Sequence, residues 1–149
     1  MRWFKIDGRE WNVRVIEPEE SFTITYTENT GRTLSEGAPM ILDPIGTFFN
    51  YTLTIARKKG EKDEFDELFD YLSRPRRDAM LVVLPKNQSV WKTKNSDGEE
   101  VEGFYAYVSK GKRKIIKIYE YENGDIKSVD YDSFSVSFIA TKAQVLPDE

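Results

Sequence analysis

Apolar and polar residues alternate along much of the chain, which is the pattern of strands that bury one face. A continuous apolar run that ends at Pro85 instead predicts a strand covered on both faces. The segments with one of these two patterns, or with clustered apolar and aromatic residues, are 11–15, 22–26, 49–55, 80–84, 104–108, 115–121 and 134–138. A weaker strand is expected at 126–129. The chain is therefore predicted to be mainly β.

Turn signals separate the expected strands and predict hairpin connections. Glycine follows Asp7, Asp97, Lys110 and Asn123, and such pairs tolerate the positive φ angles of tight turns. The first pair would join two short N-terminal strands. The last would join the strand at 115–121 to the final strands of the chain. Hairpins favour an antiparallel sheet.

One segment, at about residues 62–73, has helical periodicity. Its large apolar side chains recur at i, i+3, i+4 and i+7, which places them on one helical face; they are Phe65, Leu68, Phe69 and Leu72. Asp63 is the predicted N-cap, and Arg74-Pro75 is expected to end the helix. The apolar face should pack across the sheet. The predicted fold is a single domain, residues 1–149, in which an antiparallel β-sandwich or barrel carries one amphipathic helix.

Two segments are expected to be long loops. Residues 28–46 are rich in Gly and Pro, and residues 87–103 are polar at their centre. The second segment could also form the tip of a long hairpin.

The composition excludes several kinds of chemistry. The 149 residues include no His and no Cys, so the chain lacks the commonest general base, thiolate nucleophiles and zinc–sulfur sites. A net charge of −4 gives no overall attraction to nucleic acid. No segment reaches the roughly 20 apolar residues that span a bilayer, and no signal peptide is recognised. We therefore expect a soluble protein that is not an enzyme and uses no cofactor or metal.

Two basic clusters are the candidates for contact with a polyanion. They comprise Arg57 and Lys58, and Lys110, Lys112, Arg113 and Lys114. Lysines at turns and strand ends also keep sheet edges soluble, and that interpretation is favoured. Acidic residues are concentrated on the expected helix at Asp63, Glu64, Asp66, Glu67 and Asp70. They fit a solvated helix face better than the carboxylate pair of a hydrolase.

The segment Gly31-Arg-Thr-Leu34, followed by the strand from Asp43 to Ile55, carries a resemblance to a known group of proteins. It resembles small proteins encoded in tail gene clusters of phages and prophages of Gram-positive bacteria. The resemblance continues through the acidic Phe/Leu helix, the apolar strand ending in Leu-Pro and the closing strand at 134–140, and covers most of residues 11–147. The charged stretch from Asn95 to Glu102 is longer here.

The resemblance implies a tail-tube, distal-tail or baseplate subunit of a phage tail or phage-tail-like particle. Such a subunit is made in the bacterial host cytoplasm and resides in the virion tail. Its partners would be copies of itself in a ring and other tail proteins, without a membrane or sequence-specific nucleic acid. The loop at 28–46 either contacts a neighbouring subunit or folds on its own domain. The residues expected at a contact are Arg32, Leu34, Met40 and Ile41.

Two other functions remain open at this point. A monomeric β-rich module for binding nucleic acid or carbohydrate would need clustered exposed aromatic or basic side chains on one face. A hydrolase that uses only carboxylates would need two acids about 5 to 10 Å apart in a cleft.

Overall fold

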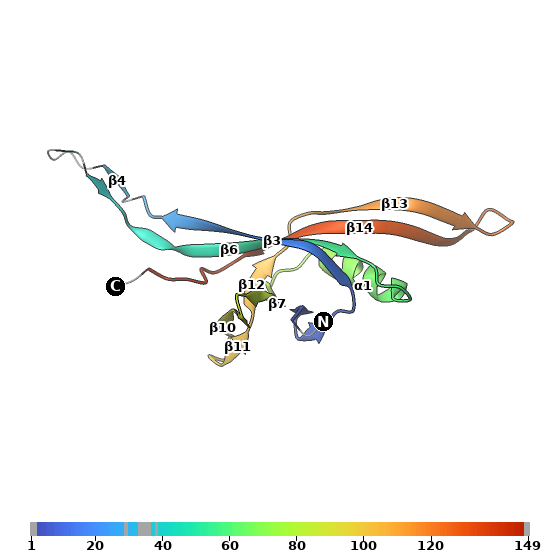
Figure 1. Ribbon diagram of the computed structural model, residues 1–149, viewed down its shortest axis with the longest axis horizontal. Helices are drawn as coiled ribbons and strands as arrows, with labels where there is room; N and C mark the ends of the chain where they lie inside the picture. The colour runs from blue at the N-terminus through green and yellow to red at the C-terminus, as the bar shows by residue number, and fades with distance from the viewer. Residues whose placement is uncertain (1–2, 29, 33–36, 38, 148–149) are drawn as a thin grey trace.

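Two long β-hairpins extend in opposite directions from a central body (Figure 1). The computed structural model describes residues 3–28, 30–32, 37 and 39–147. The first hairpin pairs β3 (Arg14–Tyr26) with β6 (Pro44–Ala56). The second pairs β13 (Gly111–Glu120) with β14 (Ile126–Ala140). Both pairs are antiparallel, so the mainly β fold with one helix predicted from the sequence is confirmed.

Eight of the described strands form one large sheet that stays open. Its order is β2 (Arg9–Glu10), β1 (Lys5–Ile6), β7 (Met80–Val83), β12 (Phe104–Tyr107), β14, β6 and β3. Along β14, one edge pairs with β6, and the other pairs with β12 and β13. Because β3 and β2 end the order without meeting, the barrel alternative is wrong.

Short strand pairs lie within both segments that were predicted as loops. The first segment contains β4 (Gly31–Arg32) and β5 (Met40–Ile41). The second contains β9 (Ser89–Val90), β10 (Lys92–Lys94) and β11 (Glu100–Glu102), and β9 pairs with β8 (Pro85–Lys86), which precedes the segment. Local hydrogen bonds stabilise the first pair, because the Thr27 hydroxyl donates to Asp43 Oδ2 at 2.6 Å and the Asp43 amide donates to Thr30 Oγ1 at 2.8 Å.

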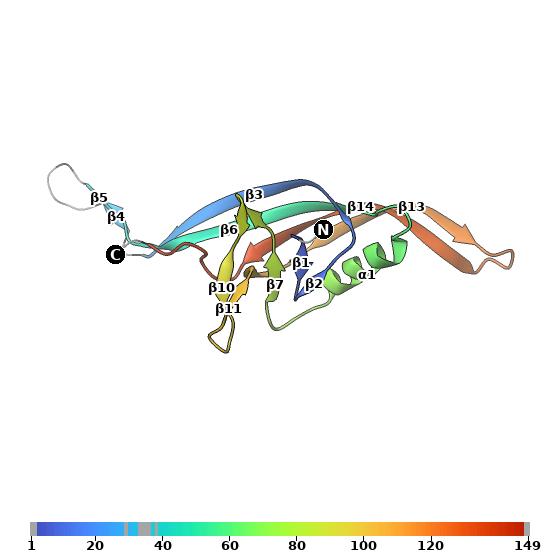
Figure 2. The ribbon, with the colours of Figure 1, turned by 60° about the horizontal axis from the view of Figure 1, so that its bottom comes forward.

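The helix has the bounds that the sequence predicts. α1 (Lys62–Ser73) buries Phe65, Leu68 and Leu72 and lies against the sheet at the base of the second hairpin (Figure 2). The prediction of Asp63 as N-cap is wrong, because the cap position is Glu61 and no side chain caps the helix. The Phe65 amide donates to the Glu61 carbonyl at 3.2 Å, so backbone bonding already begins at that residue.

A single hydrophobic cluster fills the body between the helix, the C-terminal halves of β6 and β14, and the short strands β1, β7 and β12. Ring contacts join these layers: the Tyr51 and Phe104 centroids are 5.3 Å apart, and those of Phe65 and Phe134 are also 5.3 Å apart. The cluster includes Trp11, which is 1% exposed. Burial of each such side chain contributes about 1.5 to 3 kcal/mol, so this cluster stabilises the body from which both hairpins extend.

Alternation correctly located the strands at 22–26 and 115–121 but not their environment. Phe22, Ile24 and Tyr26 were expected to be half-buried, yet all three are exposed. Most of the apolar side chains of β13 are exposed too. Both segments lie where the sheet has narrowed to two strands and no helix or second layer covers them (Figure 1).

Candidate assembly surface

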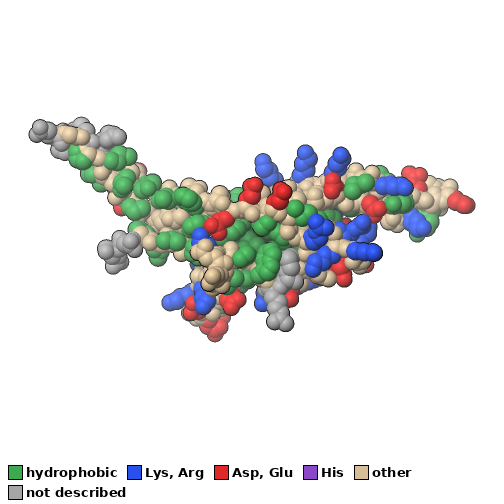
Figure 3. All heavy atoms as spheres, in the orientation of Figure 1, with side chains coloured by type: hydrophobic (Ala, Val, Ile, Leu, Met, Phe, Trp, Pro, Cys, Tyr) green, Lys and Arg blue, Asp and Glu red, His purple; other side chains and the backbone are tan. Residues whose placement is uncertain are grey.

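The first arm is the outer part of the first hairpin and comprises residues 20–28, 30–32 and 40–50. Its exposed apolar side chains are Phe22, Ile24, Tyr26, Met40, Ile41, Leu42 and Ile45. The space-filling view shows hydrophobic side chains over most of this arm and few charged ones (Figure 3). A short C-terminal segment lies along β6, because the Thr47 amide donates to the Val145 carbonyl at 2.8 Å. It adds the exposed side chains of Val145 and Leu146 to this surface.

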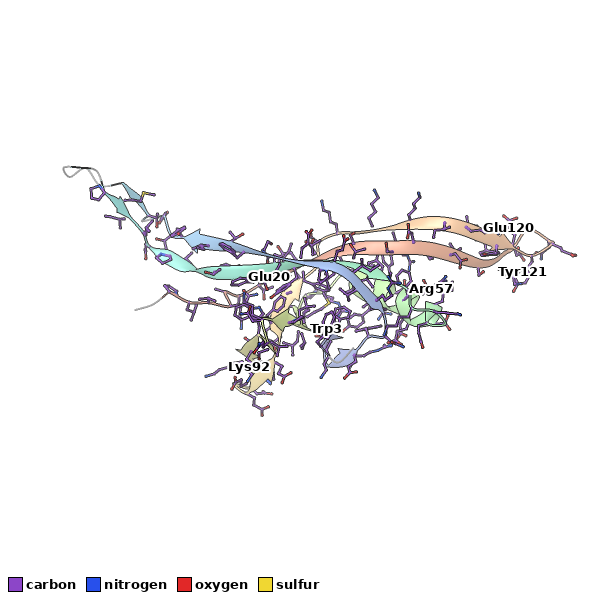
Figure 4. The ribbon with its side chains drawn as sticks, viewed as in Figure 1. Trp3, Glu20, Arg57, Lys92, Glu120 and Tyr121 are labelled. Carbon is purple, nitrogen blue, oxygen red and sulfur yellow. The ribbon has the colours of Figure 1, made fainter. Side chains whose placement is uncertain are left out.

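The second arm comprises residues 114–131 of β13, β14 and the turn between them. Its exposed apolar side chains are Ile115, Ile116, Ile118, Tyr119, Tyr121 and Ile126. Glu120 and Tyr121 mark its far end (Figure 4). Ile115 and Ile116 are adjacent, 51% and 63% exposed respectively, in a two-stranded ribbon that has no covering layer. Such a ribbon cannot bury apolar groups by itself.

Exposed large hydrophobic residues are confined almost entirely to these two arms. Apart from Val145 and Leu146 beside the first arm, Tyr107 is the one such residue found elsewhere among the described residues. Scattered apolar side chains are normal on protein surfaces, whereas contiguous apolar patches usually mark an interaction site. The two arms are therefore the candidate interface.

The strands β3 and β13 each have an edge without a partner, and close to the base of the two arms these edges carry opposite charges. β3 ends the sheet, and β13 pairs with β14 alone. Near its middle β3 carries Glu17 and Glu19, while β13 begins with Lys112 and Lys114. None of these four side chains forms an ion pair among the residues that the structure describes. Positive side chains gather over the start of β13 (Figure 3).

Arg113 fastens the base of the second arm to α1. Its Nη1 donates to Asp66 Oδ1 at 3.1 Å, and its side chain is 9% exposed. The guanidinium lies 3.9 Å from the ring centroid of Phe69 and 3.5 Å from that of Tyr131. Stacking and a charge-assisted hydrogen bond of this kind hold a helix and a strand pair in a fixed relation. The base of the second arm is therefore held in a fixed position against α1.

A polar network fastens β3 to the β8–β10 region at the root of the first arm. The buried Tyr51 hydroxyl donates to Glu20 Oε2 at 2.7 Å and accepts from Trp91 Nε1 at 2.9 Å. Lys86 donates to the other Glu20 oxygen at 3.1 Å. Burial, and then the hydrogen bond to Glu20, raise the pKa of Tyr51. Figure 4 places Glu20 near the centre of the molecule, where the arm begins.

Three rings form a row beside this network. The Phe22 and Phe49 centroids are 6.0 Å apart, and those of Phe49 and Trp91 are 5.0 Å apart. Lys86 Nζ lies 4.2 Å from the centroid of Phe49. The row ends at Phe22, which is 64% exposed. An exposed aromatic row can take part in a protein interface or stack on a sugar ring.

The expected contact residues of the 28–46 segment lie at the end of the first arm. Met40 and Ile41 are about half exposed on β5. Arg32 is on β4, where its backbone pairs with Met40. Leu34 lies outside the described residues. The sequence reasoning missed Phe22 and Leu42 in the same arm.

The six candidate polyanion residues are not equally free. Arg57 lies 3.6 Å from Asp130 Oδ1, Lys58 donates to Asn12 at 2.9 Å, and Arg113 is held by Asp66. Lys110, Lys112 and Lys114 are exposed at the connection into β13 and at its start. The first three cations thus have internal partners, and the last three are available to a ligand or to another protein surface.

Candidate chemical sites are sparse in the described part of the chain. No group of three or more carboxylates is arranged to hold a metal ion among those residues. The described chain also contains no helix that is long and apolar enough to cross a membrane. Arg9 donates to Glu67 at 2.7 Å, and this hydrogen bond lowers the pKa of that carboxyl. The acids of α1 thus serve as salt-bridge and hydrogen-bond partners at Glu64, Asp66 and Glu67.

Comparison with protein-family models, with curated proteins and with solved structures found no match. The functional argument therefore depends on the surfaces described above.

Proposed function

We propose that this protein is a structural subunit of a phage tail or phage-tail-like particle, and that it acts by assembling into rings and contacting neighbouring tail proteins. The observation that carries the proposal is the pair of arms, which extend from opposite sides of one body and hold nearly all of the exposed large apolar residues among those described. The resemblance of residues 11–147 to small tail proteins agrees with it.

The positions of the arms favour a contact between unlike surfaces. If the first arm of one copy meets the second arm of the next, each copy retains one unused arm, and the pair as a whole retains one arm of each kind. Contacts of this type repeat from copy to copy and close into a ring when the rotation permits. A contact between like surfaces would instead stop at a dimer.

Strand addition supplies a physical basis for this contact. The free edge of β13 can pair with the free edge of β3 in a neighbour, and the backbone hydrogen bonds would continue the sheet from one copy to the next. Lysines on the first edge would meet glutamates on the second, which favours this pairing over β3 with β3 or β13 with β13. The apolar arm side chains would then be covered.

The proposal is tested by the absolute mass of the purified protein, measured by light scattering from low to high concentration, with negative-stain images of the same samples. A discrete oligomer of several subunits that images as a ring or a short tube is the expected result. A dimer that remains the largest species at high concentration would contradict assembly through unlike surfaces, and a monomer throughout would contradict spontaneous assembly.

One observation favours a second function, that of a carbohydrate-binding module. The row formed by Phe22, Phe49 and Trp91 presents aromatic rings at the surface with Lys86 beside them. Sugar binding would be detected by titrating oligosaccharides while following tryptophan fluorescence in the wild type and in Trp91→Phe, because Trp3 and Trp11 also emit. This function requires a monomer with the row accessible, whereas the assembly function requires Phe22 to be covered.

A further inference from the structure

A groove with a cationic rim opens between the segment that follows α1 and the connection from β12 to β13. It has a volume of about 770 Å³. Its apolar lining includes Leu72, Met80, Ala106 and Val108. Its charged lining comprises Arg74, Arg76, Arg77 and Lys110, and Asp78 is the single carboxylate among the described residues that line the groove.

The cations of this rim are largely without partners. Arg76 donates to the Tyr71 carbonyl at 3.0 Å and stacks on the ring of that residue. Arg74, Arg77 and Lys110 form no ion pair with any described residue, and all three are exposed. Positive charges gathered around a concave surface attract an anion. Arginine rims in particular suit carboxylates, which can accept two parallel hydrogen bonds.

The same chain carries a group of acidic residues at the β10–β11 hairpin, opposite in charge to the cationic rim of the groove. The turn and second strand of this hairpin carry Asp97, Glu99, Glu100 and Glu102, and its first strand carries Lys92 and Lys94 opposite Glu102 and Glu100, so the acids without a cross-strand base are Asp97 and Glu99 in the turn. The Asn95 side chain accepts from the amides of residues 97 and 99, both at 3.0 Å, so the turn has a defined shape. None of these four acids forms an ion pair among the described residues.

The hairpin projects away from the sheet, with Lys92 at its root (Figures 2 and 4). No hydrogen bond or ion pair between described residues joins its acids to the rim cations of the same copy. Its acidic tip therefore faces outward, as a contact for another molecule.

We propose that the groove receives the acidic tip of the β10–β11 hairpin of a second copy of this protein. This inference rests on the proposed function, because it needs copies held side by side. A two-stranded hairpin is about 5 Å wide between its backbones and roughly twice that with side chains, which fits an open groove better than a buried cavity. The occupant is a folded acidic peptide segment, and its carboxylates neutralise Arg74, Arg77 and Lys110.

Charge reversal on each side tests the contact. One variant carries Arg74→Glu and Arg77→Glu, and the other carries Glu99→Arg and Glu100→Arg. Each variant alone should associate about tenfold or more weakly than the wild type, since like charges then oppose each other. An equimolar mixture of the two should recover much of the lost association, because each then offers the other a complementary surface. The control reverses one exposed lysine away from the groove, Lys59→Glu, and should associate as the wild type does.

Failure of this inference is distinguishable from failure of ring assembly. If the wild type assembles and the Arg74/Arg77 variant assembles equally well, the inference is wrong while the proposed function stands. If single variants lose association but their mixture does not recover it, the groove does not contact the tip. A wild type that remains monomeric at every concentration contradicts the proposed function itself.

Zero-length carbodiimide cross-linking of mixed ¹⁴N- and ¹⁵N-labelled protein detects the contact between groove and hairpin tip directly, even when association is weak. Cross-links between Lys110 of one copy and Glu99 or Glu100 of another support the inference. Their absence, when other cross-links between copies are present, overturns it. A labelled DNA oligonucleotide that binds the wild type and loses affinity with the Arg74/Arg77 variant would also overturn it, because the groove would then be a nucleic-acid site.

Discussion

Replacing Arg113 with alanine should destabilise the protein more than any other loss of a basic side chain on β13. The change removes a hydrogen bond to Asp66 that involves two charged groups, a kind of bond that contributes about 1.5 to 3 kcal/mol. It also removes two close stacking contacts, to Phe69 and Tyr131, each of which contributes about 0.5 to 2 kcal/mol. These terms overlap, so we expect a loss of about 3 kcal/mol in the free energy of unfolding.

Urea denaturation at one low protein concentration, where the protein is monomeric, measures this loss. With a slope of about 2 kcal/mol per molar urea, a loss of about 3 kcal/mol lowers the midpoint by about 1.5 M. The control is Lys112→Ala, the neighbouring exposed cation, which should shift the midpoint by less than about 0.3 M. Arg113→Lys should fall between them, since lysine keeps the charge but not the planar group. A midpoint for Arg113→Ala equal to that of the control would refute the structural role assigned here.

Three further predictions concern other parts of the molecule. Tyr51→Phe should lower the free energy of unfolding by about 1 to 2 kcal/mol, because the Trp91 indole that donates to the hydroxyl loses its acceptor. Since the pKa of Tyr51 in the folded protein lies above the ordinary 10.0, the wild type should also lose stability as the pH rises above 10.0. Urea titrations at about pH 9 and about pH 11 should show a smaller loss for the variant than for the wild type. Tyr121→Ser, in the second arm, should weaken self-association measured by light scattering about tenfold. Lys59→Ser, at an exposed residue outside both arms and outside the groove, should leave self-association unchanged, and equal effects would argue against a role for the arm. Gly103→Ala should lower the thermal midpoint by several degrees more than Gly98→Ala. Both glycines have positive φ, at 115° and 79° respectively, but only at Gly103 would a Cβ lie 2.6 Å from a strand carbonyl oxygen. Similar midpoints for the two variants would contradict that packing.

The core of the fold was predictable because local patterns and tertiary packing agree there. The four apolar residues of the helix occupy one face whatever lies beneath them, so Phe65 and Leu68 could be assigned to the core from spacing alone. The Asp63 cap could not, because capping depends on whether the preceding residue already has helical bonding. Alternation located the strands, but only the topology shows where the sheet narrows to two strands.

The candidate interface was only partly predictable for the same reason. Met40 and Ile41 drew attention as apolar residues in a segment rich in Gly and Pro. Phe22 was assigned to a half-buried face because its pattern is identical to that of a covered strand. A usable signal was the adjacent pair Ile115 and Ile116 in a strand rich in lysine, since apolar groups on both faces of an otherwise polar strand need cover from another element or another copy.

Arg113 illustrates what one sequence does not show. It lies in a run of cations and resembled its neighbours, yet α1 and β14 enclose it while Lys112 and Lys114 stay exposed. The difference arises from side-chain alternation along β13, which turns Arg113 toward the helix and its neighbours away. That face could be assigned only after the helix had been placed.

The central claim is that neighbouring copies cover the two arms. Hydrogen–deuterium exchange tests it most directly, when the exchange of the backbone amides is compared between dilute and concentrated wild-type protein. Slower exchange at high concentration is expected in peptides covering residues 14–26 and 111–121, with no change in peptides of α1. Unchanged exchange in both arms, in a sample whose mass shows that it has assembled, would contradict the claim.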